Sequence, residues 1–264
     1  MSQKEISQST QVSFISQAER KNARFQRYME DAHTIVPCLD GKKDVFFAGV
    51  YDGHGGKETA QFVSERLHVN LVKALNTPEL KSTESCLEHA FLLTDIESKN
   101  KELRNSGCTG VVVLIMNTDG KRIVYSANAG DSRSLLYTNG KTVRLSVDHK
   151  AADPEETKRI EGNGGFVMNH RVLGILAVSR SFGDHLYKRY VPADPYINSV
   201  ELTEESEFVV IACDGVFDVL EDDEVCKIVR EEILSGNVDG CADKLVQESV
   251  DRGSTDNITA IVIG

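Results

Sequence analysis

Two aspartates each follow a short apolar run and precede a glycine: Asp52 after Val45–Val50, and Asp214 after Phe208–Cys213. A single Asp-Gly pair usually marks a tight turn, because glycine accepts the positive φ that a reversal needs. Here both runs are typical of strands buried on both faces, and a helical pattern follows the first at about residue 57. We therefore expect two buried strands that bring their terminal carboxylates together.

Further acids stand at the ends of expected strands, namely Glu30, Asp31, Asp131 and Asp256. Carboxylates gathered without thiolates, and with few histidines, are the oxygen ligands that Mg²⁺ or Mn²⁺ prefers. Two such ions that share one aspartate can polarise a phosphate and convert a bridging water to hydroxide near neutral pH. The alternative is that each aspartate only caps or turns its own loop, and no single residue decides between the two.

Length and composition favour one domain over residues 1–264, with no appended regulatory domain. Thirty basic and 41 acidic residues give a net charge of −11, and no Lys/Arg-rich run is present. Nucleic-acid and anionic-membrane binding are therefore disfavoured. Because no apolar run reaches the length of a membrane span and the N-terminus is polar, we expect a protein of the cytosol, with the nucleus as the alternative. We also expect a monomer.

The six cysteines form no Cys-x-x-Cys pair, and none has an arginine six positions later. This pattern disfavours a zinc cluster, a redox pair and a cysteine-nucleophile phosphatase loop. We interpret all six as structural residues in a reducing compartment.

The hydrophobic periodicity changes along the chain in a way that predicts an α+β fold. The segment from Phe166 to Ile197 is irregular and is a candidate substrate-facing region. The rest predicts antiparallel sheets covered by helices, rather than alternating βαβ units. Strands are expected at 12–16, 29–36, 45–50, 111–116, 121–128, 134–137, 142–145, 208–213 and 258–263, the four from 111 to 145 as one meander, and helices at 58–76, 83–104, 154–160, 221–234 and 239–250.

Eight short motifs follow one another along the chain: Met29-Glu-Asp-Ala32, Tyr51-Asp-Gly-His-Gly-Gly56, Gly107-Cys-Thr-Gly110, Ala129-Gly-Asp-Ser-Arg133, Asp148-His-Lys150, Leu176-Ala-Val-Ser-Arg-Ser-Phe-Gly-Asp184, Ala212-Cys-Asp-Gly-Val-Phe-Asp218 and Ser254-Thr-Asp-Asn257. Together they resemble the motifs of the metal-dependent protein serine/threonine phosphatases of type 2C, in the family's order and over nearly the whole chain. The resemblance implies an antiparallel β-sandwich of two sheets with helices on both outer faces and a binuclear Mn²⁺/Mg²⁺ site at one edge.

The resemblance also implies a role for individual residues. Asp52 would bridge the two metals, with the Gly53 carbonyl and, directly or through water, Glu30 on one ion, and Asp214 and Asp256 on the other. The remaining acids and one amide would support this site: Asp31 behind the direct ligands, Asp131 and Asp218 with Asp214 around a weaker third metal, and Asn257 beside it. The Phe166–Ile197 segment corresponds to the family's flap.

The implied activity is hydrolysis of phosphoserine and phosphothreonine in proteins by a metal-bridging hydroxide, without a covalent phosphoenzyme. His54, two residues after Asp52, is the candidate acid that protonates the leaving oxygen; the alternative is a histidine that caps the glycine loop.

One position departs from the family pattern. An arginine that grips the substrate phosphate usually stands four residues before the metal-motif glutamate, but this chain has Gln26 there. Arg24 and Arg27 flank it. If the chain is extended here, Arg24 projects on the same side as Gln26, so we expect Arg24 rather than Arg27 to compensate.

The sequence also bears on three other functions. An inactive binding homologue would be expected to lose a metal ligand, but Asp52, Asp214 and Asp256 are all present. A two-metal phosphoesterase acting on small phosphates or nucleotides shares the same chemistry and stays open. A nucleotide-dependent transferase is disfavoured, because the glycines at 55 and 56 lack the Walker spacing and the Ser/Thr after the lysine.

Overall fold

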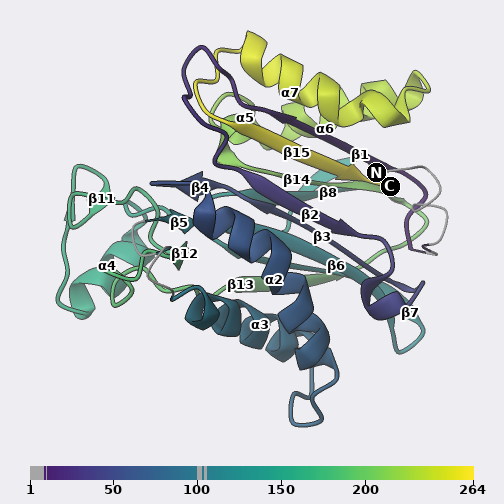
Figure 1. Cartoon of the computed structure of the whole chain (residues 1–264). Helices are drawn as coiled ribbons and strands as arrows, with labels where there is room; N and C mark the ends of the chain where they lie inside the picture. The colour runs from purple at the N-terminus through teal and green to yellow at the C-terminus, as the bar shows by residue number, and fades with distance from the viewer. Residues whose placement is uncertain (1–8, 10, 100–102, 104–105) are drawn as a thin grey trace.

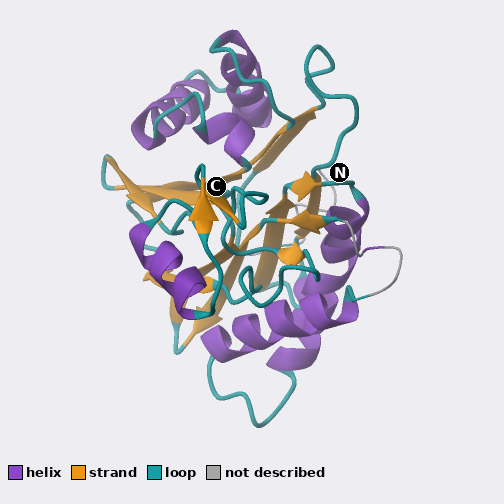
Figure 2. Ribbon diagram, turned by 90° about the vertical axis from the view of Figure 1, so that its left-hand side faces the viewer, coloured by secondary structure: helices purple, strands orange, loops and turns teal. Residues whose placement is uncertain are grey.

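Two antiparallel sheets pack face to face in the computed structural model, which describes residues 9, 11–99, 103 and 106–264. Helices cover both outer sides of the pair (Figures 1 and 2). This arrangement confirms the predicted α-β-β-α layers. One sheet has the order β1 (Ile15–Arg20), β15 (Ile258–Ile263), β14 (Ser206–Ala212), β8 (Arg133–Thr138) and β9 (Lys141–Arg144). The other has the order β13 (Tyr196–Glu201), β7 (Lys121–Ala129), β6 (Gly110–Thr118), β3 (Val45–Tyr51) and β2 (Ala32–Val36).

Strand β3 shows why the sequence reads as buried on both faces. Phe46, Ala48 and Val50 point into the core between the two sheets, whereas Phe47 and Tyr51 pack under the helices of the outer layer. Side chains alternate across a strand, so a central strand between two covered faces needs apolar residues at every position. Each large side chain buried here stabilises the fold by about 1.5–3 kcal/mol.

The outer helices lie where the sequence predicts them. α2 (Glu58–Leu75) and α3 (Thr83–Glu97) cover the β3 sheet, and α6 (Asp222–Leu234) and α7 (Cys241–Asp251) cover the β14 sheet. Ser82 caps α3, because its hydroxyl accepts a hydrogen bond from the Ser85 amide. Shorter turns of helix are η1 (Leu39–Gly41), α5 (Asp214–Phe217) and η3 (Val238–Gly240).

The flap, residues 166–197, is more ordered than its sequence indicates. Its hairpin, β10 (Val167–Met168) and β11 (Arg171–Val172), stands with α4 (Pro154–Gly162) at the left of Figure 1. Val172 and Ile160 belong to a small separate core under this hairpin. A second short sheet, β12 (Phe182–Gly183), β5 (Gly107–Cys108) and β4 (Gly53–His54), joins the flap to the residues after β3.

Several sequence predictions need correction. β1 runs from Ile15 to Arg20 rather than over 12–16, because it is an edge strand that pairs with β15 alone, where polar side chains can face solvent. α3 ends at Glu97, and 100–102 and 104–105 of its expected extension lie outside the described residues. β13 was missed, because its residues are only partly buried. The predicted meander divides between the sheets: β6 pairs with β7 in one, and β8 with β9 in the other.

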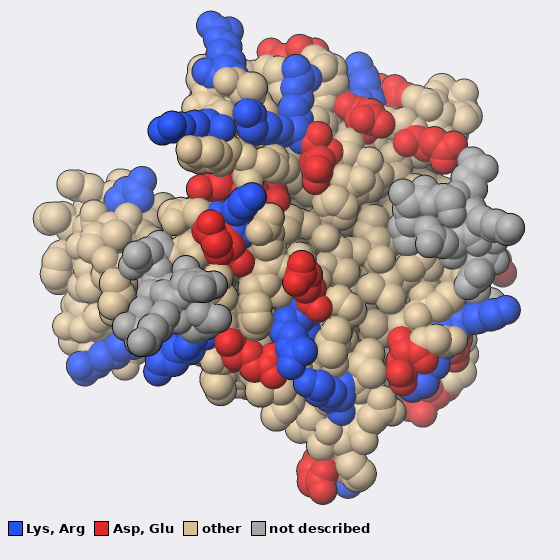
Figure 3. All heavy atoms as spheres, viewed as in Figure 1, with Lys and Arg blue, Asp and Glu red and all other residues tan. Residues whose placement is uncertain are grey.

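Within the described ranges, no helix is both long enough and apolar enough to cross a membrane. On the face seen in Figure 3, basic side chains lie among acidic ones over much of the surface.

Candidate active site

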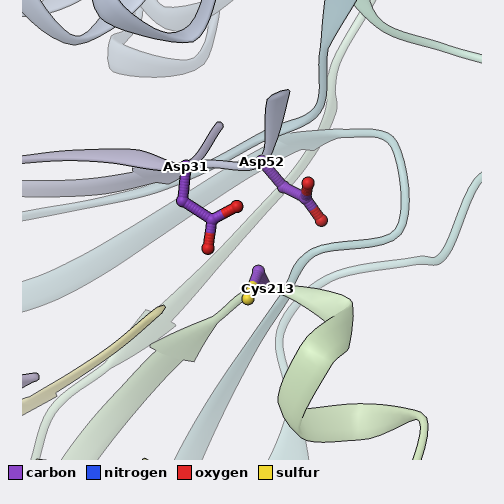
Figure 4. Close-up of side chains that lie close together, drawn as sticks. All are labelled: Asp31, Asp52 and Cys213. Atoms are coloured by element: carbon purple, nitrogen blue, oxygen red, sulfur yellow. The ribbon is translucent and has the colours of Figure 1, made fainter. Parts of the chain in front are cut away.

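The antiparallel pairing of β2 with β3 places two of the predicted acids together. Ala32, the first residue of β2, pairs with Tyr51, the last residue of β3. Asp31 and Asp52 are the next residues outward on these two strands, and both side chains point into the space above Cys213 (Figure 4). One ligand atom from each of the three residues lies within 4.8 Å of the others.

The other sheet ends at the same place. Ala212, the last paired residue of β14, is opposite both Ala260 of β15 and Arg133 of β8. Asp214 lies just after the end of β14. Its two neighbouring strands begin at the same end of the sheet, β15 just after Asp256 and β8 just after Asp131. The strands of both sheets thus deliver their carboxylates to one end of the sandwich, although the residues are distant in sequence.

A cavity of about 690 Å³ opens at this end. Its lining includes the acids Glu30, Asp52, Asp131, Asp214 and Asp256, together with Gly53, His54 and Gln26. Asp31 is buried beneath it, 8% exposed. Asp218, Asn257, Arg24 and Arg27 are not among its lining residues. The structure therefore brings together the five predicted ligands of the two main metals, whose role as ligands stays a prediction.

Close backbone approach fixes the two Asp-Gly turns. A Cβ added at Gly53 would overlap the Glu30 carbonyl oxygen, and one at Gly215 would overlap the Asn257 carbonyl oxygen. Neither glycine has a positive φ, so steric room rather than turn conformation requires glycine here. The explanation of a tight turn with positive φ therefore applies to neither glycine.

The acids of this cluster resist ionisation in the absence of a cation. Burial and the adjacent Asp214 carboxylate raise the pKa of Asp52 well above its ordinary value. Burial, together with Asp131 and Asp218, raises the pKa of Asp214 to about 8. Burial also raises the pKa of Glu30 and of Asp256. Such an arrangement costs folding free energy unless a positive charge compensates it.

The donor atoms fit a hard divalent cation. Asp214 Oδ1 and Asp31 Oδ1 are buried and accept no hydrogen bond within the described part of the chain. Buried carboxylate oxygens are normally paired, and an oxygen-only set without thiolate suits Mg²⁺ or Mn²⁺. The residues present therefore fit the divalent-metal dependence that the resemblance implies.

Cys213 lies directly beside the carboxylates of Asp31 and Asp52. Burial, with those two carboxylates, raises the pKa of its thiol well above the ordinary value, which favours the thiol over the thiolate in the absence of a cation. Its Sγ accepts a hydrogen bond from the Thr259 amide at 3.2 Å. Asp31 in turn accepts a hydrogen bond from the Thr259 hydroxyl at 2.6 Å, which fixes its carboxylate.

Asn257 ties together the two segments that carry Glu30 and Asp256. Its Oδ1 accepts a hydrogen bond from the Glu30 amide at 2.8 Å, and its Nδ2 donates to the carbonyl oxygens of Lys21 and Tyr28. The side chain is buried, 5% exposed. Asn257 therefore positions backbone at the site and does not face the cavity.

His54 has a partner that the sequence analysis missed. Its Nε2 lies 2.7 Å from Asp184 Oδ2, and Ser181 Oγ donates to the same oxygen. Although burial opposes it, the hydrogen bond from His54 lowers the pKa of Asp184. Asp184 adopts a φ of 46°, a left-handed conformation that is uncommon for aspartate. The glycine-loop alternative for His54 is therefore less favoured, because a buried carboxylate orients the ring.

Lys150 forms ion pairs with two of the three acids predicted to hold a third metal. Its Nζ lies 3.7 Å from Asp131 Oδ2 and 3.7 Å from Asp218 Oδ1. Burial raises the pKa of Asp131, and the nearby ammonium opposes that rise. The chain therefore supplies its own cation where a third metal was predicted.

Replacing Lys150 with Met should lower the melting temperature of the metal-free protein at pH 7. The ammonium is partly exposed and screened, so we expect about 1 kcal/mol, or about 2–4 °C. Added Mn²⁺ should then raise the melting temperature of Lys150→Met more than that of the wild type. Thermal denaturation with and without metal measures both, and Lys244→Met, which breaks a surface pair with Glu248, is the matched control. Equal Mn²⁺-induced rises in melting temperature for Lys150→Met and the wild type would contradict the view that Lys150 takes the place of a third metal.

The expected strand phase around Gln26 is wrong. Asn22 has a φ of 55°, and its carbonyl accepts hydrogen bonds from the Phe25 and Gln26 amides, so the chain turns here. Arg24 consequently borders a different cavity. Arg27 is exposed, with its guanidinium 5.3 Å from the centre of the Tyr28 ring. The argument that Arg24 compensates for Gln26 therefore fails.

Comparison with known proteins gives the same assignment as the motifs. A family model described as "Protein phosphatase 2C" matches residues 16–258. "Protein phosphatase 2C homolog 1" of Saccharomyces cerevisiae is 37% identical over 259 residues, which cover 93% of this chain and 91% of the yeast protein. The protein of the same description from Schizosaccharomyces pombe is 36% identical over 252 residues, covering 93% of this chain and 71% of that protein.

Solved structures share the fold. A phosphatase from a pathogenic strain of Toxoplasma gondii superposes with a TM-score of 0.84 at 24% identity, over 97% of this chain and 93% of that one. A C. elegans sex determining protein superposes with a TM-score of 0.85 at 24% identity, over 95% of this chain and 64% of that one. Since the family model spans most of the sequence and the curated relatives align along nearly all of it, the chain belongs to the protein phosphatase 2C family of serine/threonine phosphatases.

Proposed function

We propose that this phosphatase uses two divalent cations, Mn²⁺ or Mg²⁺, to transfer the phosphoryl group of protein phosphoserine and phosphothreonine directly to water. The observation that carries the proposal is the group of Glu30, Asp52, Asp214 and Asp256 around one cavity that also holds His54. Asp52 would contact both cations, with Glu30 and the Gly53 carbonyl on one side and Asp214 and Asp256 on the other. When bound, the cations supply positive charge for the phosphate and increase the acidity of water.

The side chains present account for the rest of the reaction without a covalent phosphoenzyme. No cysteine lines the cavity among the residues described, and the acceptor in this proposal is water: its oxygen forms a bond to phosphorus as the bond to the serine or threonine oxygen breaks. That oxygen leaves as an alkoxide and needs a proton. Because His54 Nε2 pairs with Asp184, the proton would come from Nδ1 of the doubly protonated imidazolium, and the proton that the attacking water loses would restore it.

Release of phosphate from a phosphothreonine peptide tests the proposal. We expect turnover with Mn²⁺ or Mg²⁺, loss with a chelator and recovery when metal is restored. Hydrolysis of nucleotides or small phosphates at rates well above the rate for the peptide would instead support a small-molecule phosphoesterase. Turnover that survives complete metal removal would contradict the proposal.

We also propose that the protein acts as a monomer in a reducing compartment, the cytosol or the nucleus, on phosphoprotein substrates rather than on nucleic acid. The net charge of −11 and the six free cysteines support this view.

A further inference from the structure

The cavity is strongly acidic for a site that must bind a phosphate. Its lining carries six carboxylates, from Glu30, Asp52, Asp131, Asp184, Asp214 and Asp256. Two divalent cations would offset part of this charge, but a phosphate dianion also requires donors that fix its orientation. Among the residues described, Arg171 of β11 is the one guanidinium or ammonium group in the lining.

Gln26 does not supply these donors. Its Nε2 donates to the Thr255 carbonyl oxygen at 3.1 Å and to Asp256 Oδ1 at 2.9 Å. Both amide hydrogens are therefore engaged, and the second holds a predicted metal ligand in place. The Gln26 amide could donate both hydrogens to phosphate only if these two hydrogen bonds broke. The Asp256 carboxylate would then lose a hydrogen bond that fixes its position.

Three other basic side chains near this site, in sequence or in space, do not line the cavity. The guanidinium of Arg24 stacks on the ring of Phe25, 5.3 Å from its centre, and Arg24 borders another cavity. Arg27 is exposed and absent from the lining. Lys150 is paired with Asp131 and Asp218.

Arg171 stands on a stiff support. Its hairpin turns at Asn169 and His170, which have φ values of 52° and 60° and so match the twist of a two-residue hairpin. The next residue, Val172, is 1% exposed in the small flap core. The Arg171 Nη1 donates to the Ile175 carbonyl oxygen at 2.8 Å. No described carboxylate forms a salt bridge with Arg171, so its Nε and Nη2 donors have no partner of that kind.

We infer that Arg171, presented by the flap, grips the substrate phosphate in place of the arginine that Gln26 replaces. The Nε–H and Nη2–H groups form the planar fork that binds two phosphate oxygens at once. The inference rests on the proposed function, because it assigns a binding residue within that same cavity. It also gives the flap a direct role in the affinity for the substrate phosphate, whereas the acids predicted to bind metal would act on the turnover of bound substrate.

Steady-state kinetics at saturating Mn²⁺ test the inference, with a phosphothreonine peptide and an aryl phosphate as substrates. Arg171→Ala should raise KM about tenfold or more for both, because both carry the phosphate, and should change kcat less. Arg171→Lys should fall between, since it keeps the charge but loses the fork. Arg189→Ala, an exposed arginine of the same flap that does not line the cavity, is the matched control and should leave both constants unchanged.

Calorimetric binding of inorganic phosphate to the metal-loaded protein gives a readout that does not need turnover. We expect Arg171→Ala to weaken phosphate binding by a similar factor, with a melting temperature close to that of the wild type. Unchanged KM and unchanged phosphate binding would overturn the inference. A KM raised for the peptide alone would also overturn it, because Arg171 would then contact peptide rather than phosphate. An inactive wild type with Arg171-dependent phosphate binding would overturn the proposed function and leave this inference standing.

Discussion

Asp52→Asn should lower the turnover of phosphothreonine peptide at least a thousandfold while the fold stays intact. The substitution keeps the shape of the side chain but removes the charge predicted to be shared by both cations. A thousandfold loss corresponds to about 4 kcal/mol of transition-state stabilisation. Steady-state rates at saturating Mn²⁺ measure the effect, and circular dichroism checks the fold. Asp119→Asn, the same change in the exposed turn between β6 and β7, is the control. Near-wild-type rates in Asp52→Asn would rule out the two-metal site.

Although Asp52→Asn should impair turnover, it should raise the stability of the metal-free protein. Burial and Asp214 raise the pKa of Asp52, and the pKa of Asp214 itself reaches about 8. The folded state therefore binds protons that the unfolded chain releases near pH 4, so this contribution to stability falls as the pH rises from about 4 to about 8. With a chelator, Asp52→Asn should melt higher than the wild type at pH 8 and show a weaker decline between pH 5 and pH 8.

Bound metal should reverse this penalty in the wild type. Because a cation binds the folded cluster and not the unfolded chain, saturating Mn²⁺ should raise the melting temperature at pH 8, and should raise that of Asp52→Asn much less. Identical metal-induced shifts in the two proteins would show that Asp52 is not a ligand.

His54→Ala should slow hydrolysis of serine and threonine phosphates by about a hundredfold to a thousandfold, yet have little effect on an aryl phosphate. An alkoxide needs a proton as it leaves, whereas a phenolate is already a weak base, so only the first reaction needs a general acid. The ratio of kcat values for the two substrates is the measurement. His89→Ala, an exposed histidine on α3, is the control.

Asp184→Asn extends the test to the partner of His54. Its side chain can still meet the imidazole, but without charge, so it should shift the substrate ratio in the same direction by a smaller factor. Equal losses on peptide and aryl substrates in His54→Ala would exclude His54 as the acid and leave the pair with Asp184 a structural one.

The sequence by itself determined the features that depend on local periodicity. β3 and β14 are apolar at almost every position because both of their faces are covered, so their ends, and hence Asp52 and Asp214, could be located. α2 followed from helical spacing, α4 from the Asp153 cap with Pro154, and α6 from its acidic first turn. The layered fold then followed from the order of strands and helices and from the family resemblance.

The tertiary structure alone decided the contacts between distant segments. Asp184 lies 130 residues from His54, and the position of Lys150 between Asp131 and Asp218 depends on how β8 and β14 pair. The turn at Asn22 overturned the expected strand phase, because side chains alternate between two faces only where the chain is extended, and the Phe25 and Gln26 amides instead donate back to the Asn22 carbonyl. Arg171 reaches the cavity only because the flap hairpin packs on its own small core, and no local pattern in the sequence encodes that docking.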